Sequence, residues 1–485
     1  MSSGPDPILD AVRAAFPALV KNKDYVYSEN AGGSQVLGSV AAKMGAYLLD
    51  SNVQMADYDL AHQAEARVDQ GYAATALLLG QGVSADEVLF GASATQLVEN
   101  LSRMIEQSII ERQVWNKGDE IIITDVDHET NRGSWKRLAD RQGLVIQVWK
   151  AIPIPNSKSS KAVFLDPESL NGIVTPRTRL VAFTACSNVL GGFVDVPAAV
   201  RIIKEKSEGN AWTCLDAVAC APHRRIKPLE LGVDFVFWSW YKVYGPHIGS
   251  MYLPRRAQTE LLTRLNHHFL HGYSGTYPFQ PSSQCYEAIY ALTAVVDYYA
   301  ALGKLALAHK QGRSSTSGGA AAVDALAKAP ELDWSTTLKN GARFEEHSEQ
   351  IDAAFEWMQA HETALLGEIM GKLRSLADQG LLEVVGDSET DADHRAATIA
   401  FVKGSNARSS LGSSSSSSSS KEIHSHIVQD KKRGAQQGHM YAYDLITGLG
   451  LSKEDGVVRI SLVHYNSVND AAAIGNAIEA AIKAQ

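Results

Sequence analysis

Between residues 38 and 255, short apolar runs alternate with longer segments of helical periodicity, of which the clearest span about 38–50 and 60–80. Seven runs are predicted to be strands: Glu87–Phe90, Ile121–Thr124, Leu144–Val148, Leu180–Thr184, Trp212–Leu215, Phe235–Trp238 and Ser250–Leu253. Strands that alternate with helices favour an α/β fold with a mostly parallel sheet covered on both faces. Because ligands bind such sheets beyond the carboxyl ends of the strands, the residues that follow each run are candidates for a site.

The pattern changes on either side of this region. The chain begins with a short helical segment, and beyond Cys285 strand-like runs become sparse. Helices at about 284–302 and 343–378 and strands at Leu382–Val385, Thr398–Val402 and Val457–Val463 predict a smaller α+β region. With 485 residues, the chain is long enough for a large domain and a smaller partner. We expect an N-terminal segment (1–25), a large domain (26–285) and a connecting helix with a small domain (286–485).

Two stretches cannot bury apolar area. Ser413–Ser420 is a serine tract, and Gly312–Gly319 is small and polar. We expect a disordered surface loop at about 405–420 and an insertion at the second stretch.

Composition excludes several classes of protein. The net charge is −9, and no basic stripe with interleaved aromatic residues is present, which disfavours nucleic-acid binding. The four cysteines have no metal-ligand spacing, which suits reduced thiols in the cytoplasm and no metal site. No signal pattern begins the chain. The most apolar long segment, Ala288–Ala308, contains Asp297 and Lys304, so we expect a buried helix and no membrane association.

A single lysine stands at the end of the most apolar strand. The run from Val233 to Trp240 predicts a buried strand, and Gly245-Pro246 breaks the chain soon after Lys242. Burial disfavours a charged ammonium, and the free amine of such a lysine forms Schiff bases. On this stretch alone, a lysine that extends from the strand end to water is an open alternative.

Polar residues follow other predicted strands. Asp216 lies 26 residues before Lys242, about one strand–crossover–strand unit, so the two can occupy neighbouring strand ends. Small residues from Gly91 open a helix whose N–H groups, with the Thr95 hydroxyl, would hold a phosphate; a simple helix cap is the alternative. His128 could stack on a flat ring or be a structural histidine. A carboxylate, an amine and a phosphate cradle are what pyridoxal phosphate requires.

The segment Ser239-Trp-Tyr-Lys-Val-Tyr-Gly-Pro resembles the Ser-x-His-Lys-x-x-Gly-Pro motif of class V aminotransferases, the cysteine-desulfurase-like branch of fold-type-I pyridoxal-phosphate enzymes. Tyr241 replaces the histidine. The resemblance extends from about Tyr25 to Tyr465. It implies a large domain with a mostly parallel seven-stranded sheet, a smaller α+β C-terminal domain, bound pyridoxal 5'-phosphate, an amino-acid substrate and a homodimer.

The resemblance also assigns roles to individual residues. It implies that Lys242, His128 and Asp216 are catalytic. The residues that it places around the cofactor are Ala94, Thr95, His128, Asn188, Asp216, Ser239, Tyr241, Lys242 and Gln280. The residues that it places at the substrate are Asn30, Arg459 and Tyr441, and a bidentate grip on the substrate carboxylate explains the arginine.

Three positions depart from the family pattern. Ala219 replaces a polar residue beside the cofactor's phenolic oxygen, which leaves His223 as another source of that hydrogen bond. Gln280 replaces a threonine that reaches the partner subunit's phosphate. In the loop Gln437–Ala442, Tyr441 stands where desulfurases carry their persulfide cysteine.

We therefore expect an enzyme that acts on a small amino acid through an external aldimine at Cα or Cβ. A lyase, or a carbon–carbon bond-forming enzyme similar to fungal decarboxylative aldolases, fits better than a persulfide-forming desulfurase. An aminotransferase, a cysteine desulfurase or C–S lyase, and a catalytically silent scaffold are the alternatives.

Overall fold

A computed structural model describes residues 7–157, 159–265, 267–270, 272–281, 283–311, 326, 331–337, 341–404 and 419–484. The predicted insertion at 312–319, and all of the predicted loop at 405–420 except its last two residues, lie outside this range. Ser419 and Ser420 are ordered, which corrects the predicted end of the disordered loop. Ser419 caps helix α14 (Ser420–Ile427), because its hydroxyl accepts a hydrogen bond from the Glu422 amide and the Glu422 side chain accepts one from the Ser419 amide.

The seven predicted strands form one sheet in the order β1-β9-β8-β7-β6-β2-β3. Their bounds are β1 (Val88–Gly91), β2 (Glu120–Thr124), β3 (Val145–Trp149), β6 (Thr178–Thr184), β7 (Trp212–Asp216), β8 (Phe235–Ser239) and β9 (Gly249–Tyr252). β2 runs parallel to β3 and β6, and β6 runs parallel to β7, whereas β9 is antiparallel to β1 and β8. The predicted α/β fold with a mostly parallel sheet is confirmed.

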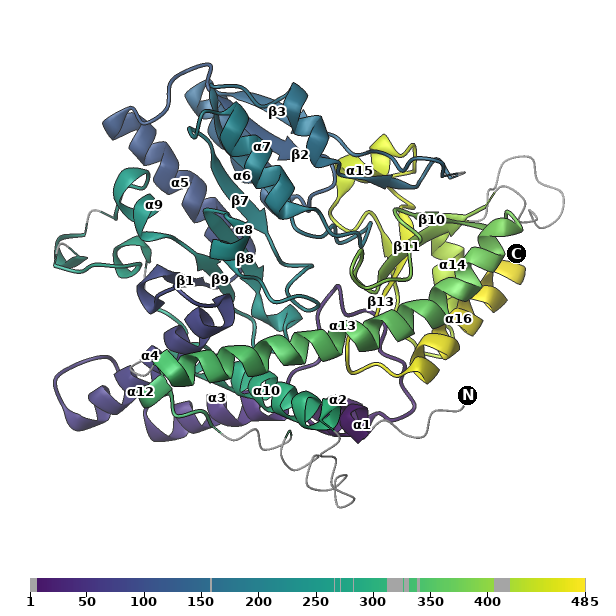
Figure 1. Cartoon of the computed structure of the whole chain (residues 1–485), viewed down its shortest axis with the longest axis horizontal. Coiled ribbons are helices and arrows are strands. Elements are labelled where there is room, and N and C mark those ends of the chain that lie inside the picture. The colour runs from purple at the N-terminus through teal and green to yellow at the C-terminus, as the bar shows by residue number, and fades with distance from the viewer. Residues whose placement is uncertain are drawn as a thin grey trace. The chain divides into compact units, whose positions relative to one another are not determined.

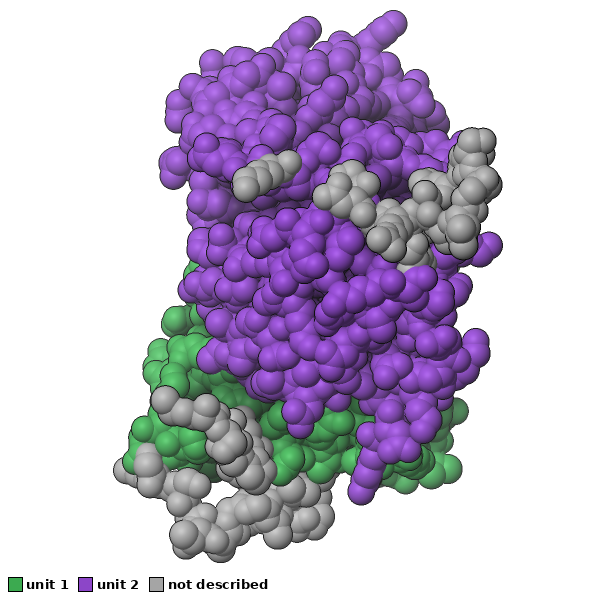
Figure 2. Space-filling model, turned by 90° about the vertical axis from the view of Figure 1, so that its right-hand side faces the viewer, with its two compact units in different colours: residues 1–22, 34–116, 224–357 green, residues 23–33, 117–223, 358–485 purple. Residues whose placement is uncertain are grey.

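The chain divides into two compact units, each made of three separate segments (Figure 2). Unit 1 comprises 1–22, 34–116 and 224–357, and unit 2 comprises 23–33, 117–223 and 358–485. These units differ from the contiguous domains predicted from the sequence, whose boundaries stay a prediction.

Unit 1 contains a helical layer and one set of strands. Helix α10 (Tyr286–Lys310) packs against α3 (Gly38–Asp50) and α4 (Asp59–Leu79), as Figure 1 shows. A Cβ atom on Gly71 of α4 would lie 2.2 Å from the Ile289 carbonyl oxygen, so glycine permits this close approach. α10 is long and apolar enough to span a membrane, but most of its apolar stretch is buried in the protein, as expected of a core helix. Helix α5 (Ala94–Arg112) packs on β1, β8 and β9.

Unit 2 contains the other strands and a second, four-stranded antiparallel sheet. Helix α6 (Thr130–Gln142) packs on β2, β3 and β6, and α7 (Val196–Lys206) precedes β7. The second sheet has the order β10-β11-β13-β12 and comprises β10 (Leu382–Val385), β11 (Thr398–Lys403), β12 (Gln436–Gly438) and β13 (Val457–Ser461). Its apolar core also includes side chains from α13 (Gly341–Asp378), α14 and α16 (Val468–Lys483). Figure 1 shows these helices beside the second sheet.

Short elements complete the described chain. The helices are α1 (Pro7–Ala14), α2 (Pro17–Lys21), α8 (Pro228–Leu231), α9 (Arg255–Glu260), α12 (Trp334–Thr337) and α15 (Tyr443–Gly448). β4 (Ile152–Pro153) and β5 (Val163–Phe164) form a two-stranded ribbon.

Candidate active site

In unit 1, the start of α5 lies against the end of β8. Ser239, the last residue of β8, pairs with Gly249 of β9. A Cβ atom on Gly249 would lie 2.5 Å from the carbonyl carbon of Ser93 and 2.6 Å from the amide nitrogen of Ala94. The structure thus brings the predicted phosphate-binding residues Ala94, Thr95 and Ser239 to one place. The Ser93 hydroxyl caps α5 by accepting from the Gln96 amide, and the N-terminus of this 19-residue helix favours an anion.

The predicted lysine follows directly. After Ser239, a single 3₁₀ turn (Trp240–Lys242) turns the chain, and Lys242 is 9% exposed. Its Nζ lies 5.9 Å from the centre of the Tyr241 ring. Tyr241, which replaces the family's histidine, stacks on the His247 ring with 4.9 Å between centres. Lys242 is therefore a largely buried amine beside the phosphate-binding end of α5.

Gln280 belongs to a different part of unit 1. Its amide nitrogen donates to the Tyr72 hydroxyl at 2.8 Å, and both residues line a cavity of about 650 Å³. None of the other predicted site residues lines this cavity. Whether Gln280 reaches a partner subunit stays a prediction.

In unit 2, Asp216 ends β7 and is accompanied by a second buried carboxyl group, Asp127. One Asp216 carboxylate oxygen accepts from the Val218 amide at 2.8 Å. Asp127 accepts from the Thr124 hydroxyl and, at 3.0 Å, from the Asn131 amide. Burial and then the nearby Asp216 charge raise the pKa of Asp127 to about 7. Asp127 was not predicted as a site residue, although its place directly before His128 at a strand end was a usable signal.

The predicted residues His128 and Tyr441 are in contact. Their ring centres lie 5.2 Å apart, and the Tyr441 carbonyl accepts from the Glu129 amide at 2.8 Å. His128 Nδ1 accepts from the Thr130 amide, so the proton of the neutral ring is on Nε2. Met440 and Tyr441 both have left-handed backbones, with φ of 51° and 58°, which is unfavourable for such side chains. Tyr441 is nevertheless 67% exposed, so its phenol is available to a ligand.

Asn188 and Arg459 form the rest of this group. Asn188 donates to the Met440 carbonyl at 2.8 Å, which fixes the loop before Tyr441, and its own carbonyl accepts from Arg459 at 3.2 Å. Arg459 also lies 3.4 Å from a Glu29 carboxylate oxygen. Burial lowers the pKa of the Arg459 guanidinium, and Glu29 offsets part of this effect.

Asn30 lies at the end of β13. Its amide nitrogen donates to the Ser461 carbonyl at 2.8 Å, and its amide oxygen accepts from the Tyr465 hydroxyl. Asn30 is 2% exposed. These hydrogen bonds support the end of β13, and contact of Asn30 with a substrate stays a prediction.

Both groups of residues fit pyridoxal phosphate. In unit 1, the missing Cβ of Gly249 leaves room for the start of α5, where a phosphate would bind. In unit 2, the buried Asn188 Oδ1 and Arg459 Nε have no hydrogen-bond partner among the described residues. Buried polar atoms without partners are costly, and a polar ligand would satisfy them.

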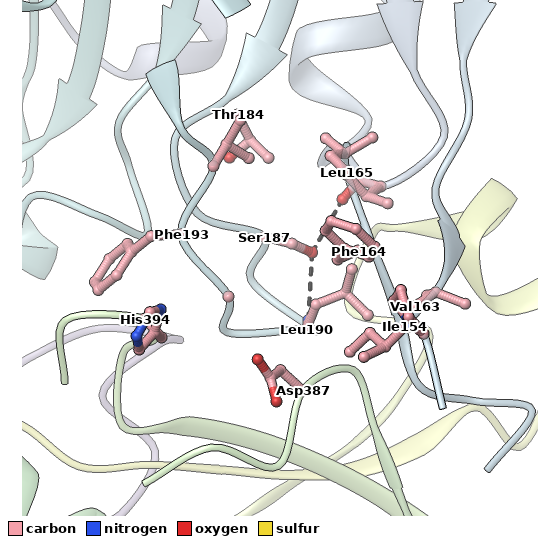
Figure 3. A pocket seen from close by; sticks show the side chains of 14 residues that line it. Ile154, Val163, Phe164, Leu165, Thr184, Ser187, Leu190, Phe193, Asp387 and His394 are labelled. Carbon is pink, nitrogen blue, oxygen red and sulfur yellow. Dashed lines mark hydrogen bonds between the residues drawn. The ribbon is translucent and has the colours of Figure 1, made fainter. Parts of the chain in front are cut away.

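Unit 2 contains a cavity of about 250 Å³ whose lining is mostly apolar (Figure 3). It is lined by Val126, Ile154, Pro155, Val163, Phe164, Leu165, Thr184, Ser187, Leu190, Gly192, Phe193, Val194, Asp387 and His394. The Ser187 hydroxyl donates to the Val126 carbonyl and accepts from the Leu190 amide. The cavity adjoins the segments that carry His128 and Asn188 but is lined by neither residue, so we do not assign it to the candidate site.

Comparison with known proteins agrees with this geometry. The family described as Aminotransferase class-V matches residues 26–347. "Aminotransferase-like protein FGM3" of Gibberella zeae is 33% identical over 97% of this chain and 98% of its own. "Cysteine desulfurase-like protein ustD" of Aspergillus flavus is 33% identical over 38% of this chain and 40% of its own. The apo structure of a cysteine desulfurase from Thermococcus onnurineus NA1 has the same fold, with a TM-score of 0.71 and 17% identity over the whole of both chains.

Proposed function

Because the chain belongs to the class V aminotransferase family, whose members use pyridoxal phosphate, we propose that it acts on a small amino acid at Cα or Cβ, as a lyase or by forming a carbon–carbon bond. The bound cofactor supplies an electron sink for the bond that breaks at Cα. The protein supplies binding, orientation and proton control.

Each group of the candidate site has a proposed task. Lys242 provides the amine that holds the cofactor covalently, and the start of α5 with Ser239 binds its phosphate. Asp216 keeps a proton on the ring nitrogen, while His128 packs on the ring. Arg459 binds the substrate carboxylate, since its guanidinium is buried and its Nε has a free donor.

The burial and pKa of the cysteine thiols argue against a desulfurase. A desulfurase needs a reactive thiolate at the substrate. Tyr441 occupies the loop position of the persulfide cysteine. Three of the four cysteines (Cys186, Cys214 and Cys220) are buried. Burial, followed by a hydrogen bond with Glu287, raises the pKa of the exposed Cys285 to about 11, so its thiolate is scarce at neutral pH.

The test is to incubate the holo-protein with each common amino acid, with and without an aldehyde or a keto acid, and to identify products by mass. We expect a product of Cα or Cβ bond cleavage, or a new carbon–carbon bond, with at least one amino acid. With cysteine and a reductant, we expect little alanine or sulfide. Rapid alanine release, together with a mass gain of one sulfur on the protein, would contradict the proposal.

Transamination is the second candidate, because the relative that matches over almost the full length is described as aminotransferase-like. The same incubation distinguishes it. An aminotransferase would form one molecule of a new amino acid from the keto acid for each molecule of amino acid consumed. The consumed amino acid would become a keto acid that keeps its carboxylate and side chain.

A further inference from the structure

Four ionisable side chains, of which three are buried and His361 is partly buried, form a cluster in unit 2 outside the groups described above. His223 Nδ1 lies 2.8 Å from a Glu362 carboxylate oxygen, and these side chains are 4% and 0% exposed. His361, next to Glu362 on α13, donates through Nε2 to the Asn466 carbonyl at 2.7 Å. His464 is completely buried. Because Nδ1 of His223 is engaged by Glu362, the hydrogen bond from His223 to the cofactor's phenolic oxygen, which stays a prediction, would have to come from Nε2.

One member of the cluster stays neutral. Burial and then the neighbouring His361 and His223 lower the pKa of His464 well below its usual value, so His464 is neutral. His223 and Glu362 form a buried, hydrogen-bonded pair. Buried polar or charged pairs are commonly no more stabilising than apolar side chains of similar size, so stability alone is a weak reason for this pair.

A continuous series of turns joins His223 to Asp216. A carboxylate oxygen of Asp216 accepts from the Val218 amide at 2.8 Å, the Ala217 carbonyl accepts from the Ala221 amide at 2.8 Å, and the Cys220 carbonyl accepts from the His223 amide at 2.9 Å. The segment has few free torsions, so a shift at its far end changes the position of the Asp216 carboxylate. Glu362 holds that far end through the imidazole.

The same cluster lies near a second functional strand. His464 follows β13, the strand that carries Arg459, by three residues, and its electrostatic coupling to His223 and His361 places it beside both. The cluster thus joins the segment after β7, helix α13 and the segment after β13.

We propose that Glu362 and His223 are positioning residues, which hold the Asp216 carboxylate in line with the cofactor's ring nitrogen by fixing the far end of residues 216–223. This inference rests on the proposed role of Asp216. In this role neither residue binds the cofactor itself. Their effect on cofactor binding therefore passes through Asp216 and disappears when the carboxylate is absent.

The experiment is a double-mutant cycle on the apo-protein, read out as the dissociation constant of pyridoxal phosphate from its absorption spectrum. Glu362→Gln keeps the size of the side chain and removes its charge. We expect the dissociation constant to rise about tenfold, as when an orienting partner of a metal ligand is removed. Glu368→Gln, on the same helix but partly exposed, is the matched control and should leave it unchanged. Urea unfolding of each apo-protein checks that the variants fold.

The cycle is closed in the Asp216→Ala background. In that background Glu362→Gln should not raise the dissociation constant further, because the carboxylate that it positions is absent and the effects of coupled residues do not add. A full tenfold effect in that background would overturn the inference, as would an unchanged dissociation constant for Glu362→Gln alone. If Asp216→Ala itself leaves cofactor binding unchanged, the proposed role of Asp216 fails instead. If Glu362→Gln does not fold, His223→Gln replaces it, with His426→Gln as control and the same criteria.

Discussion

The proposed cofactor chemistry depends most directly on Lys242. Lys242→Ala should abolish covalent attachment of the cofactor, because the variant lacks the amine beside the start of α5. Borohydride reduction of the holo-protein, followed by peptide mass analysis, measures this attachment. Lys304→Ala, an exposed lysine on α10, is the control and should keep it. A labelled lysine other than Lys242 in the wild-type protein would refute the assignment.

Asp127 gives a prediction about pH. Its pKa in the folded protein is about 7, raised from the usual aspartate value of 3.8, so between about pH 4 and 7 the folded state retains a proton that the unfolded state has lost. The unfolded state binds fewer protons in this range, so the Asp127 contribution makes the protein less stable as the pH rises. Asp127→Asn removes this contribution.

The measurement is the free energy of unfolding of the apo-protein in urea at pH 5 and pH 7.5. The free energy of unfolding of Asp127→Asn minus that of the wild type should be larger at pH 7.5 than at pH 5. An equal difference at the two pH values would show that Asp127 is ionised in the folded protein across this range.

The residues of the candidate site were predictable only where a motif or a strand end marks them. Asp216 and Ser239 end strands β7 and β8, and Lys242 follows β8, so a strand end or the lysine motif marks each of them. The pairs Glu29 with Arg459 and His223 with Glu362 join residues more than 100 positions apart. No local pattern encodes such a pair, since each partner alone resembles an ordinary surface charge. The hydrogen bonds of Asn30 to the end of β13 are equally non-local and could not be predicted.

Among the elements, the junction of β9 with α5 offers a sharp test. Gly249→Ala should weaken cofactor binding, because the new Cβ would collide with the backbone at Ser93 and Ala94 and displace the start of α5. We expect a rise of the cofactor dissociation constant of at least about tenfold, or 1.4 kcal/mol. Gly45→Ala is the control, since a Cβ there has no neighbour within 4 Å and alanine favours the helix. An unchanged constant would exclude this junction from the phosphate site.

Apolar runs were predictable as elements, and short polar elements were not. The strands of the main sheet are apolar runs, largely buried in every strand except β3, and their period and length identify them. β12 consists of Gln436–Gly438, and it is a strand only because β13 supplies its hydrogen-bond partners. Val26 and Glu29 form only isolated bridges, with Arg433 and Ser461, and these also depend on partners far away in the sequence.

At the scale of the whole molecule, we predict a homodimer. Large apolar side chains are exposed at the end of α3 and before α4, and Leu49 is 87% exposed. Exposed apolar groups of this kind favour a protein interface. Sedimentation of the holo-protein should give a dimer, and Leu49→Glu should shift it towards monomer. Val145→Glu, at an exposed position of β3, is the control. A wild-type monomer at working concentration would contradict the prediction.

The two interleaved units have a consequence for synthesis. Each unit is assembled from three segments that are far apart in the sequence. The last segment of unit 2 includes α16. On the ribosome, β1 therefore waits until β9, more than 150 residues later, has emerged before it can pair. The apolar strands made in the interval have no complete core to enter, and such surfaces are prone to aggregate. Nascent chains of this protein should therefore depend on holding chaperones until α16 has been synthesised.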